Sequence, residues 1–265
     1  MSTAWRLIDS GPCDAFYNMA LDEAIALAVR DGHSPPALRF YGWTVPSVSI
    51  GSFQKVTDVD CAYCSSHSLP VVRRPTGGRG ILHGDELTYS VSSRNEGAFS
   101  RGLLDTYRRI SRALQAGLER IGLPMAMKEE RETGRVLTRS PHCFQSTSYG
   151  EIRFQTRKAV GSAQKRWREG FLQQGSLPYS IDYGRLPLVF SGMEQTTRGG
   201  STETAEPAMV GLRELLPDLD PERVKECLVL AFEELFSVRL VPSRPSDREQ
   251  GLALRLSSEK YLPLC

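Results

Sequence analysis

The order of strand-like and helix-like segments constrains the fold of this chain most, because the strands occur in clusters instead of alternating regularly with helices. Strand-like patterns predict strands at 5–9, 37–41, 47–50, 71–74 and 87–91. Gly11-Pro12 is expected to break the chain after the first strand, and residues 150–178 alternate like paired strands. Because a regular βαβ pattern is missing, the sequence predicts an α+β fold with one dominant mixed sheet.

Apolar residues at three- and four-residue spacing predict helices around these strands. The predicted helices run from Asp14, a candidate N-cap, to about Gly32, from Asp105 to Ile121, and near 207–216 and 222–236. The tract from Gly192 to Pro207 is rich in Thr, Ser and Gly and is typical of a mobile surface loop.

The length of 265 residues suits one large domain, so we predict a single domain over 1–265, with a core at about 5–240 and a short helical C-terminal extension. A net charge of +2 gives no reason to expect a nucleic-acid partner. No apolar run approaches the ~20 residues that span a bilayer. The N-terminus also lacks a basic and then apolar signal region. The default expectation is a cytoplasmic protein that binds neither membrane nor nucleic acid.

The six cysteines are sparse and irregularly spaced, and in a reducing cytoplasm most of them are expected to be free thiols. Cys61-x-x-Cys64, followed by His67, could indicate zinc or redox chemistry. A structural zinc site needs four ligands, however, and no second Cys-x-x-Cys pair occurs. We therefore favour a short helix after Thr57 or Asp58 that carries both thiols on or near its inner face, and we predict no metal site.

A glycine pair bounded by basic residues lies between two predicted strands, in the segment Arg73-Arg74-Pro75-Thr76-Gly77-Gly78-Arg79-Gly80-Ile81-Leu82-His83. Glycine lets the backbone approach a ligand closely and expose its N–H groups to a carbonyl or phosphate oxygen. The loop matches neither of the common nucleotide fingerprints. It can be a tight turn or a substrate cradle, and its three arginines leave both interpretations open.

Cys143 is a candidate nucleophile. A single cysteine is usually a buried filler, but here polar and turn-forming residues surround it, in Ser140-Pro141-His142-Cys143-Phe144-Gln145-Ser146. A reactive thiol needs a nearby cation that favours its thiolate form. His142 points to the opposite side of an extended chain, so it should not reach the thiol easily.

Lys158 is the preferred cation, because it can return alongside Cys143 if the chain turns near Tyr149-Gly150. Four small residues that leave room for a ligand follow it, namely Ala159, Gly161, Ser162 and Ala163. A desolvated lysine can hold a developing oxyanion or, in its neutral form, accept a proton. His83 is a second candidate base and ranks below Lys158.

The glycine loop and Glu86-Leu87-Thr88-Tyr89-Ser90-Val91 resemble the substrate loop of the biotin/lipoate protein ligase superfamily. The segments 140–144, 157–164 and 174–177 resemble its LipM-type octanoyltransferase branch. The combination of motifs, over about residues 5–240, carries the resemblance. It implies a catalytic domain with mixed, largely antiparallel sheets flanked by helices. Gly80 and Gly84 depart from the pattern, since an alanine and an acidic residue are expected there.

The resemblance implies that Cys143 attacks the thioester of octanoyl-acyl carrier protein and forms an acyl-enzyme. A lysine of a lipoyl-domain protein, such as the glycine-cleavage H protein or an E2 subunit, then receives the octanoyl group. Lys158 is expected to position the acyl carbonyl and to favour the thiolate. The implied substrate-binding residues are Arg73, Arg74, Thr76, Gly77, Gly78, Arg79, His83, Gly161, Ser162 and Ala163. Neither a metal nor a nucleotide cofactor is required, and a monomer is expected.

Three alternatives remain. Lipoate ligases of the same superfamily use ATP, but they typically have a third glycine where this chain has Arg79 and lack a cysteine that matches Cys143. Many also carry a C-terminal accessory domain, for which the residues beyond about 240 are too few. A lipoyl-domain amidotransferase would use the same cysteine chemistry. A non-catalytic acyl- or lipoyl-domain-binding protein would keep the fold without using Cys143.

Overall fold

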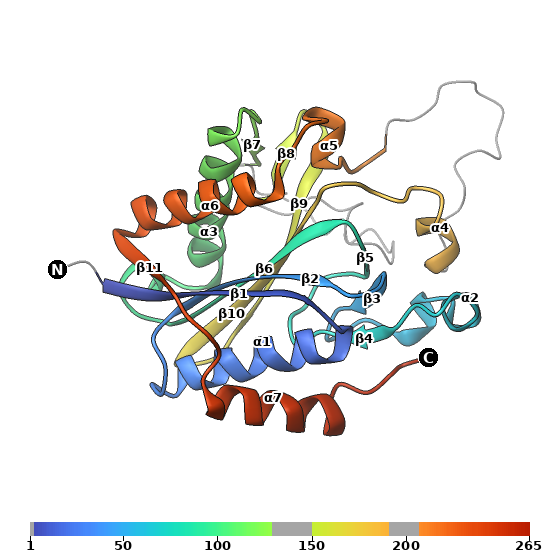
Figure 1. The fold of residues 1–265 in the computed structure, drawn as a ribbon, viewed down its shortest axis with the longest axis horizontal. Coiled ribbons are helices and arrows are strands. Elements are labelled where there is room, and N and C mark those ends of the chain that lie inside the picture. The colour runs from blue at the N-terminus through green and yellow to red at the C-terminus, as the bar shows by residue number, and fades with distance from the viewer. Residues whose placement is uncertain (1–2, 129–149, 191–206) are drawn as a thin grey trace.

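The computed structural model describes residues 3–128, 150–190 and 207–265, which form two sheets with helices around them (Figure 1). The large sheet has the strand order β11-β1-β2-β6-β10-β9-β8-β7, and the small one β4-β3-β5. The strands of the large sheet are β1 Thr3–Cys13, β2 Ala37–Trp43, β6 Glu86–Arg94, β7 Ala126–Met127, β8 Ile152–Phe154, β9 Arg157–Arg166, β10 Gly170–Pro178 and β11 Val238–Pro242. Those of the small sheet are β3 Ser47–Ile50, β4 Val71–Arg73 and β5 Ile81–His83.

Both sheets are mixed. In the large one, β1 runs parallel to β2 and β11, and the pairs from β2 through β6, β10, β9 and β8 to β7 are antiparallel. In the small one, β3 pairs parallel with β4 and antiparallel with β5. The predicted α+β fold with mixed, largely antiparallel sheets is therefore confirmed.

Helices cover both faces of the large sheet (Figure 1). On one face, α3 (Leu103–Arg120) packs against α6 (Pro221–Phe236) over an aromatic and aliphatic core. On the other, α1 (Ala15–Arg30) lies between the sheet and α7 (Asp247–Glu259). Alternate residues of each strand point to opposite faces, so β6 places Tyr89 in the α3 core and Ser90 toward α1. The remaining helices are short: α2 Cys61–Ser66, α4 Leu186–Val189 and α5 Leu212–Leu215.

Local signals explain most of these boundaries. Asp14 accepts hydrogen bonds from the backbone N–H groups of Phe16 and Tyr17, so it is the predicted N-cap of α1. Gly11-Pro12 does not end β1, because the strand continues through an irregularity between Asp9 and Pro12 with Gly11 at a φ of +59°. Of the segment expected near 207–216, only α5 is helical.

The chain around and beyond residue 240 packs against the start of the large sheet. β11 pairs with β1 at one edge of the large sheet, and α7 begins with a capping box formed by Ser246 and Glu249. The Arg6 guanidinium of β1 donates two hydrogen bonds of 2.8 Å to the Glu249 carboxylate. The C-terminal segment then runs back toward α2 and the small sheet (Figure 1).

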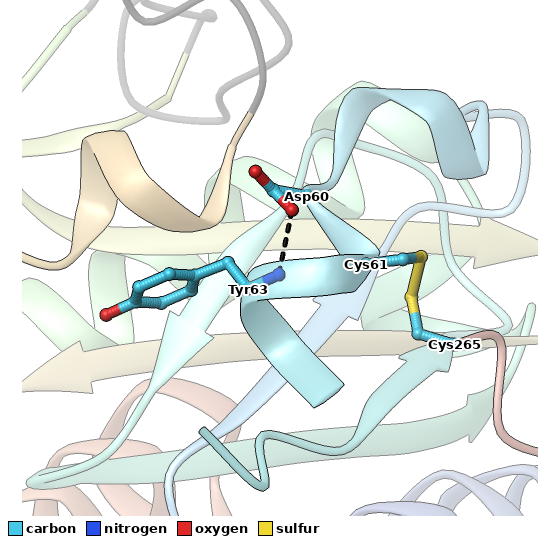
Figure 2. Close-up of a disulfide and its surroundings, with 4 residues drawn as sticks. All are labelled: Asp60, Cys61, Tyr63 and Cys265. Carbon is cyan, nitrogen blue, oxygen red and sulfur yellow. Dashed lines mark hydrogen bonds between the residues drawn. A yellow bond between two sulfur atoms is a disulfide. The ribbon is translucent and has the colours of Figure 1, made fainter. Parts of the chain in front are cut away.

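That segment ends in a disulfide between Cys265 and Cys61, the first residue of α2 (Figure 2). The expectation that the cysteines are free is therefore wrong for these two, which the fold brings to a Cα–Cα distance of 5.2 Å across 204 residues of sequence. The predicted short helix is present, with Asp60 as its N-cap through a hydrogen bond from the Tyr63 backbone N–H. Cys64 is buried inside, as expected, and its thiol is free.

No helix within the described parts of the chain is long and apolar enough to span a membrane. The tract from Gly192 to Pro207, expected as a mobile loop, lies outside the described residues except for Pro207.

Candidate functional site

The glycine loop connects β4 to β5 and packs its backbone directly on the end of β3. Gly78 has a φ of +84°, which only glycine adopts freely, and its carbonyl oxygen lies against Gly51. A Cβ built on Gly77, by contrast, would meet nothing within 4 Å, so this glycine faces open space.

The two arginines before the glycines hold backbone carbonyls. Arg73 donates from Nη1 to the carbonyls of Gly51, at 2.9 Å, and Gln54, at 2.6 Å. Arg74 is buried and donates to the carbonyls of Gly77 and Arg79, both at 2.7 Å. Arg74 therefore shapes the glycine loop, and Arg73 holds the segment that follows β3.

Thr76 ties the loop to the large sheet. Its side chain is fully buried and donates a 2.8 Å hydrogen bond to Oε1 of Gln174 on β10. Gln174 in turn donates from Nε2 to Asp22 of α1, at 2.7 Å. The loop position is thus linked to the first helix through one buried amide.

Asp22 is the centre of a buried polar network. It pairs with Arg39 of β2 at 2.7 Å, and both side chains are fully buried. Ser90 and Tyr41 donate hydrogen bonds to the same carboxylate. A buried charge pair of this kind fixes geometry strictly, because the loss of one partner leaves the other charge uncompensated.

His83, at the end of β5, belongs to a second polar cluster. Its Nε2 lies 2.7 Å from Oγ of Ser49, its Nδ1 lies 2.8 Å from Oε1 of Glu86, and its ring stacks on Trp43 with centroids 3.8 Å apart. Burial alone would raise the pKa of the Glu86 carboxyl, but the His83 imidazole and hydrogen bonds from His83, Thr88 and Ser176 hold it below its ordinary value. His83 is therefore buried in a fixed orientation.

Two cavities bring the predicted motifs together. One, of about 250 Å³, is lined by Gly77 and Gly78, by Leu103, Leu104 and Tyr107 of α3, and by Ser162, Ala163 and Gln164 of β9. The other is narrow and mostly apolar, and it shares Ser162 and Ala163 with the first. Its remaining lining is Met19, Tyr41, Trp43, Ser49, Arg74, Ile81, His83, Thr88, Gly161, Gln174, Gly175 and Ser176.

The glycine loop and the small residues of β9 thus meet at one place, although about 85 residues separate them in sequence. Gly161 and Ser162 pair with Ser176 and Gly175 of β10, which sets their position beside the narrow cavity. Gly175 itself leaves no room for a side chain, since a Cβ there would lie 2.3 Å from the Tyr89 ring.

Lys158 is buried, with 2% of its side chain exposed, and Nζ donates a 2.6 Å hydrogen bond to Oε1 of Glu151. The backbone of Lys158 is also fixed, because its N–H donates to Ala208 and its carbonyl accepts from Val210. Lys158 does not line either of the two cavities.

Cys143 and its neighbours from 140 to 148 lie outside the described residues. The structure places Lys158 and the ten predicted substrate-binding residues, and seven of those ten line one of the two cavities; Arg73, Thr76 and Arg79 belong to the loop without lining either cavity.

Sequence reasoning missed several residues of the site. Glu151 carried the weak signal of a carboxylate seven residues before Lys158 in a strand-like segment. Gly51 could have been noticed as a glycine directly after a predicted strand. Gln174 begins one of the segments that carry the resemblance, but nothing in the sequence singles out its side chain. Asp22 carried no local signal, because only the packing of α1 on β10 brings it to Gln174.

No group of three or more His, Cys, Asp or Glu side chains that could hold a metal occurs in ranges 3–128, 150–190 and 207–265. This observation covers Cys61-x-x-Cys64 and His67, where Cys61 is bonded to Cys265 instead.

The chain matches known proteins over nearly its whole length. The model of the lipoyl protein ligase A/B catalytic domain matches residues 14–233. Octanoyltransferase LipM of Moorella thermoacetica is 38% identical over 250 residues, which cover 93% of this chain and 92% of the relative.

Two solved structures share the fold. One is a lipoate-protein ligase A bound with ATP, with a TM-score of 0.79, 21% identity, and coverage of 98% of this chain and 96% of the other. The second comes from a bipartite lipoate protein ligase of Thermoplasma acidophilum studied with its E2 lipoyl domain, with a TM-score of 0.78, 21% identity and coverage of 98% and 93%. By its sequence matches, this chain belongs to the lipoyl protein ligase A/B catalytic-domain family and, within it, to the octanoyltransferase LipM proteins.

Proposed function

We propose that this protein moves an octanoyl group from octanoyl-acyl carrier protein to a lysine of a lipoyl-domain protein, through an acyl-enzyme on Cys143. The observation that carries the proposal is the convergence of Gly77 and Gly78 with Ser162 and Ala163 on one cavity. A second cavity, which shares Ser162 and Ala163 with the first, is lined mostly by apolar surface, and such a lining suits an acyl chain.

The first step forms an acyl-enzyme. The thiolate of Cys143 attacks the thioester carbonyl, a new carbon–sulfur bond forms, and the carrier's phosphopantetheine thiolate leaves and takes up a proton. In the second step the acceptor lysine, as a neutral amine, attacks the new thioester. A carbon–nitrogen bond forms, the carbon–sulfur bond to Cys143 breaks and regenerates its thiolate, and the attacking nitrogen releases one of its two protons to solvent. Lys158 supplies the cation that favours the thiolate and holds the acyl carbonyl.

The proposed acceptors are lipoyl-domain proteins such as the glycine-cleavage H protein or an E2 subunit. The structural neighbour studied with its E2 lipoyl domain supports this class of acceptor. We further propose that residues 1–265 act as one catalytic domain, as a monomer, and in the cytoplasm. The reaction as written needs neither a metal nor a nucleotide.

Intact-mass measurement tests this function directly. Purified protein mixed with octanoyl-acyl carrier protein, without ATP, should gain one octanoyl group on Cys143 and pass it to a lipoyl domain. Cys143→Ser should form no thioester adduct and should transfer at a small fraction of the wild-type rate. Unchanged transfer by this variant would remove Cys143 as the nucleophile.

Other outcomes separate the alternative functions. Strict dependence on ATP and free octanoate would identify a ligase. Transfer only from one octanoylated lipoyl domain to another would identify an amidotransferase. Tight binding of the acyl carrier or of a lipoyl domain without any transfer would identify a binding protein.

A further inference from the structure

Lys158 and Glu151 form a charge pair that is almost completely removed from solvent. Nζ of Lys158 and Oε1 of Glu151 are 2.6 Å apart, and the two side chains are 2% and 3% exposed. Lys158 is the only hydrogen-bond partner of the Glu151 carboxylate within the described parts of the chain, and Oε2 of Glu151 has none there. The buried Glu151 carboxylate therefore makes its side-chain hydrogen bond to Lys158.

The backbone holds both residues of this pair in place. The Lys158 backbone N–H donates a hydrogen bond to the Ala208 carbonyl, and the Lys158 carbonyl accepts one from the Val210 N–H. The Glu151 carbonyl accepts a hydrogen bond from the Lys128 backbone N–H, which fixes the start of β8. Just before it, Gly150 has a φ of +84°, and a Cβ there would lie 3.1 Å from the Tyr107 ring. The backbone thus fixes the position from which the Glu151 carboxylate contacts the Lys158 ammonium.

Burial without a counter-charge would favour a neutral lysine, because removing an ammonium from water is costly. A carboxylate in hydrogen-bond contact reverses this preference and favours the ammonium. Glu151 therefore favours the first of the two chemical roles open to Lys158, a fixed cation, over the second, a neutral proton acceptor.

We propose that Glu151 is the positioning residue of Lys158, which keeps it charged and fixes its ammonium so that it acts as a cation and not as a proton acceptor. The inference rests on the proposed acyl transfer for its catalytic consequence, but the charge state of Lys158 can be measured without that reaction.

The first measurement is the Cε and Nζ chemical shifts of Lys158 in protein labelled with ¹³C,¹⁵N-lysine. The signal is assigned by its loss in Lys158→Met. Wild-type protein should give the ammonium signal, and Glu151→Gln should give the neutral-amine signal. Glu151→Asp keeps the charge and should keep the ammonium.

The second measurement is the kinetics of octanoyl transfer. Lys158→Met should lower kcat roughly 100- to 1000-fold, as expected for the loss of a group that stabilises developing charge. Glu151→Gln should approach this loss with little change in KM, and Glu151→Asp should recover part of the rate. In the Lys158→Met background, Glu151→Gln should cause no further loss, because the two residues act as one unit.

The ion pair of Arg157, the residue directly before Lys158, provides a matched control for Glu151→Gln. Arg157 pairs with Glu214 at 2.8 Å, with side chains 19% and 36% exposed. Glu214, on α5, pairs with the residue directly before Lys158, so Glu214→Gln removes a charge of the same sign from the same region, and it should alter neither the Lys158 signal nor kcat. If Glu151→Gln does not fold, the charge-free Glu151→Gln/Lys158→Met protein and Glu151→Asp supply the comparison.

The outcomes distinguish the inference from the proposed function. An ammonium signal and wild-type kcat in Glu151→Gln, alongside a large loss in Lys158→Met, would overturn the role of Glu151 and leave the function standing. If wild-type protein transfers no octanoyl group, the proposed function fails. The chemical shifts would still decide whether Glu151 keeps Lys158 charged.

Discussion

A Cβ built on Gly51 would lie 1.9 Å from the carbonyl oxygen of Gly78, so the end of β3 and the glycine loop are in direct backbone contact. Any side chain on Gly51 must displace the loop, because no flexible group can move away instead. We expect Gly51→Ala to lower octanoyl transfer at least tenfold, since misplacement by about 1 Å can cost roughly 100-fold. Steady-state kinetics with octanoyl-acyl carrier protein would measure this.

Gly251 provides the control for that substitution. It lies in the middle of α7, is exposed, and a Cβ there would meet nothing within 4 Å. Gly251→Ala should leave transfer unchanged and raise the free energy of unfolding by about 0.5–1 kcal/mol, because alanine favours the helix. Wild-type activity in Gly51→Ala would mean that the loop adjusts without consequence.

The buried hydrogen bond from Thr76 to Gln174 can be tested by removing one hydroxyl group. Thr76→Val keeps the shape of the side chain but leaves Oε1 of Gln174 buried without this donor. The expected loss in unfolding free energy is about 1–3 kcal/mol, measured by urea denaturation. Thr76→Ser keeps the hydroxyl and should lose clearly less; an equal loss would show that the hydroxyl contributes no more to stability than the methyl group does.

The sequence predicted the elements whose signals are local, and it missed those that depend on distant packing. Asp14 caps α1 as expected, and the amphipathic pattern of α3 is confirmed. The turn between β8 and β9, by contrast, places a non-glycine residue, Gln155, at a φ of +53°, which no turn signal announces. That turn brings Glu151 beside Lys158, so the pair could not be predicted. The disulfide between Cys61 and Cys265, which are 204 residues apart in sequence, could likewise not be predicted, because only the fold brings the two cysteines together.

At Gly80 an aromatic ring occupies the space where a side chain would lie. A Cβ there would lie 2.2 Å from Cε1 of Phe190, which is 1% exposed. Gly80→Ala should therefore destabilise the protein by about 1–3 kcal/mol through overpacking. Phe190→Leu in the same chain should recover part of this loss, as a double-mutant cycle in urea would show. Additive losses would contradict the contact.

The disulfide between Cys61 and Cys265 should contribute to stability by restricting the unfolded chain. Cys265→Ser is expected to lower the unfolding free energy by about 2–4 kcal/mol. A thiol reductant should lower the Tm of wild-type protein to a similar extent and leave the Tm of Cys265→Ser unchanged. The backbone hydrogen bond from Leu264 to Val71 remains in the variant, so the fold should persist. An equal response of both proteins to the reductant would show that the bond does not form.

The pair formed by Arg6 and Glu249 predicts a pH dependence of stability. Burial alone would raise the pKa of the Glu249 carboxyl, but hydrogen bonds from Arg6 and the Ser246 backbone, with the Arg6 charge, hold it below the ordinary 4.5. A carboxyl with a lowered pKa in the folded state contributes stability that is fully present above 4.5 and is lost as the pH falls through the folded value. Glu249→Gln should lower the unfolding free energy at neutral pH by roughly 1–3 kcal/mol. Its stability should also fall less steeply than that of wild-type protein below pH 4.5, in urea titrations across the acid range. Parallel pH profiles of the two proteins would remove this pair as a source of the acid sensitivity.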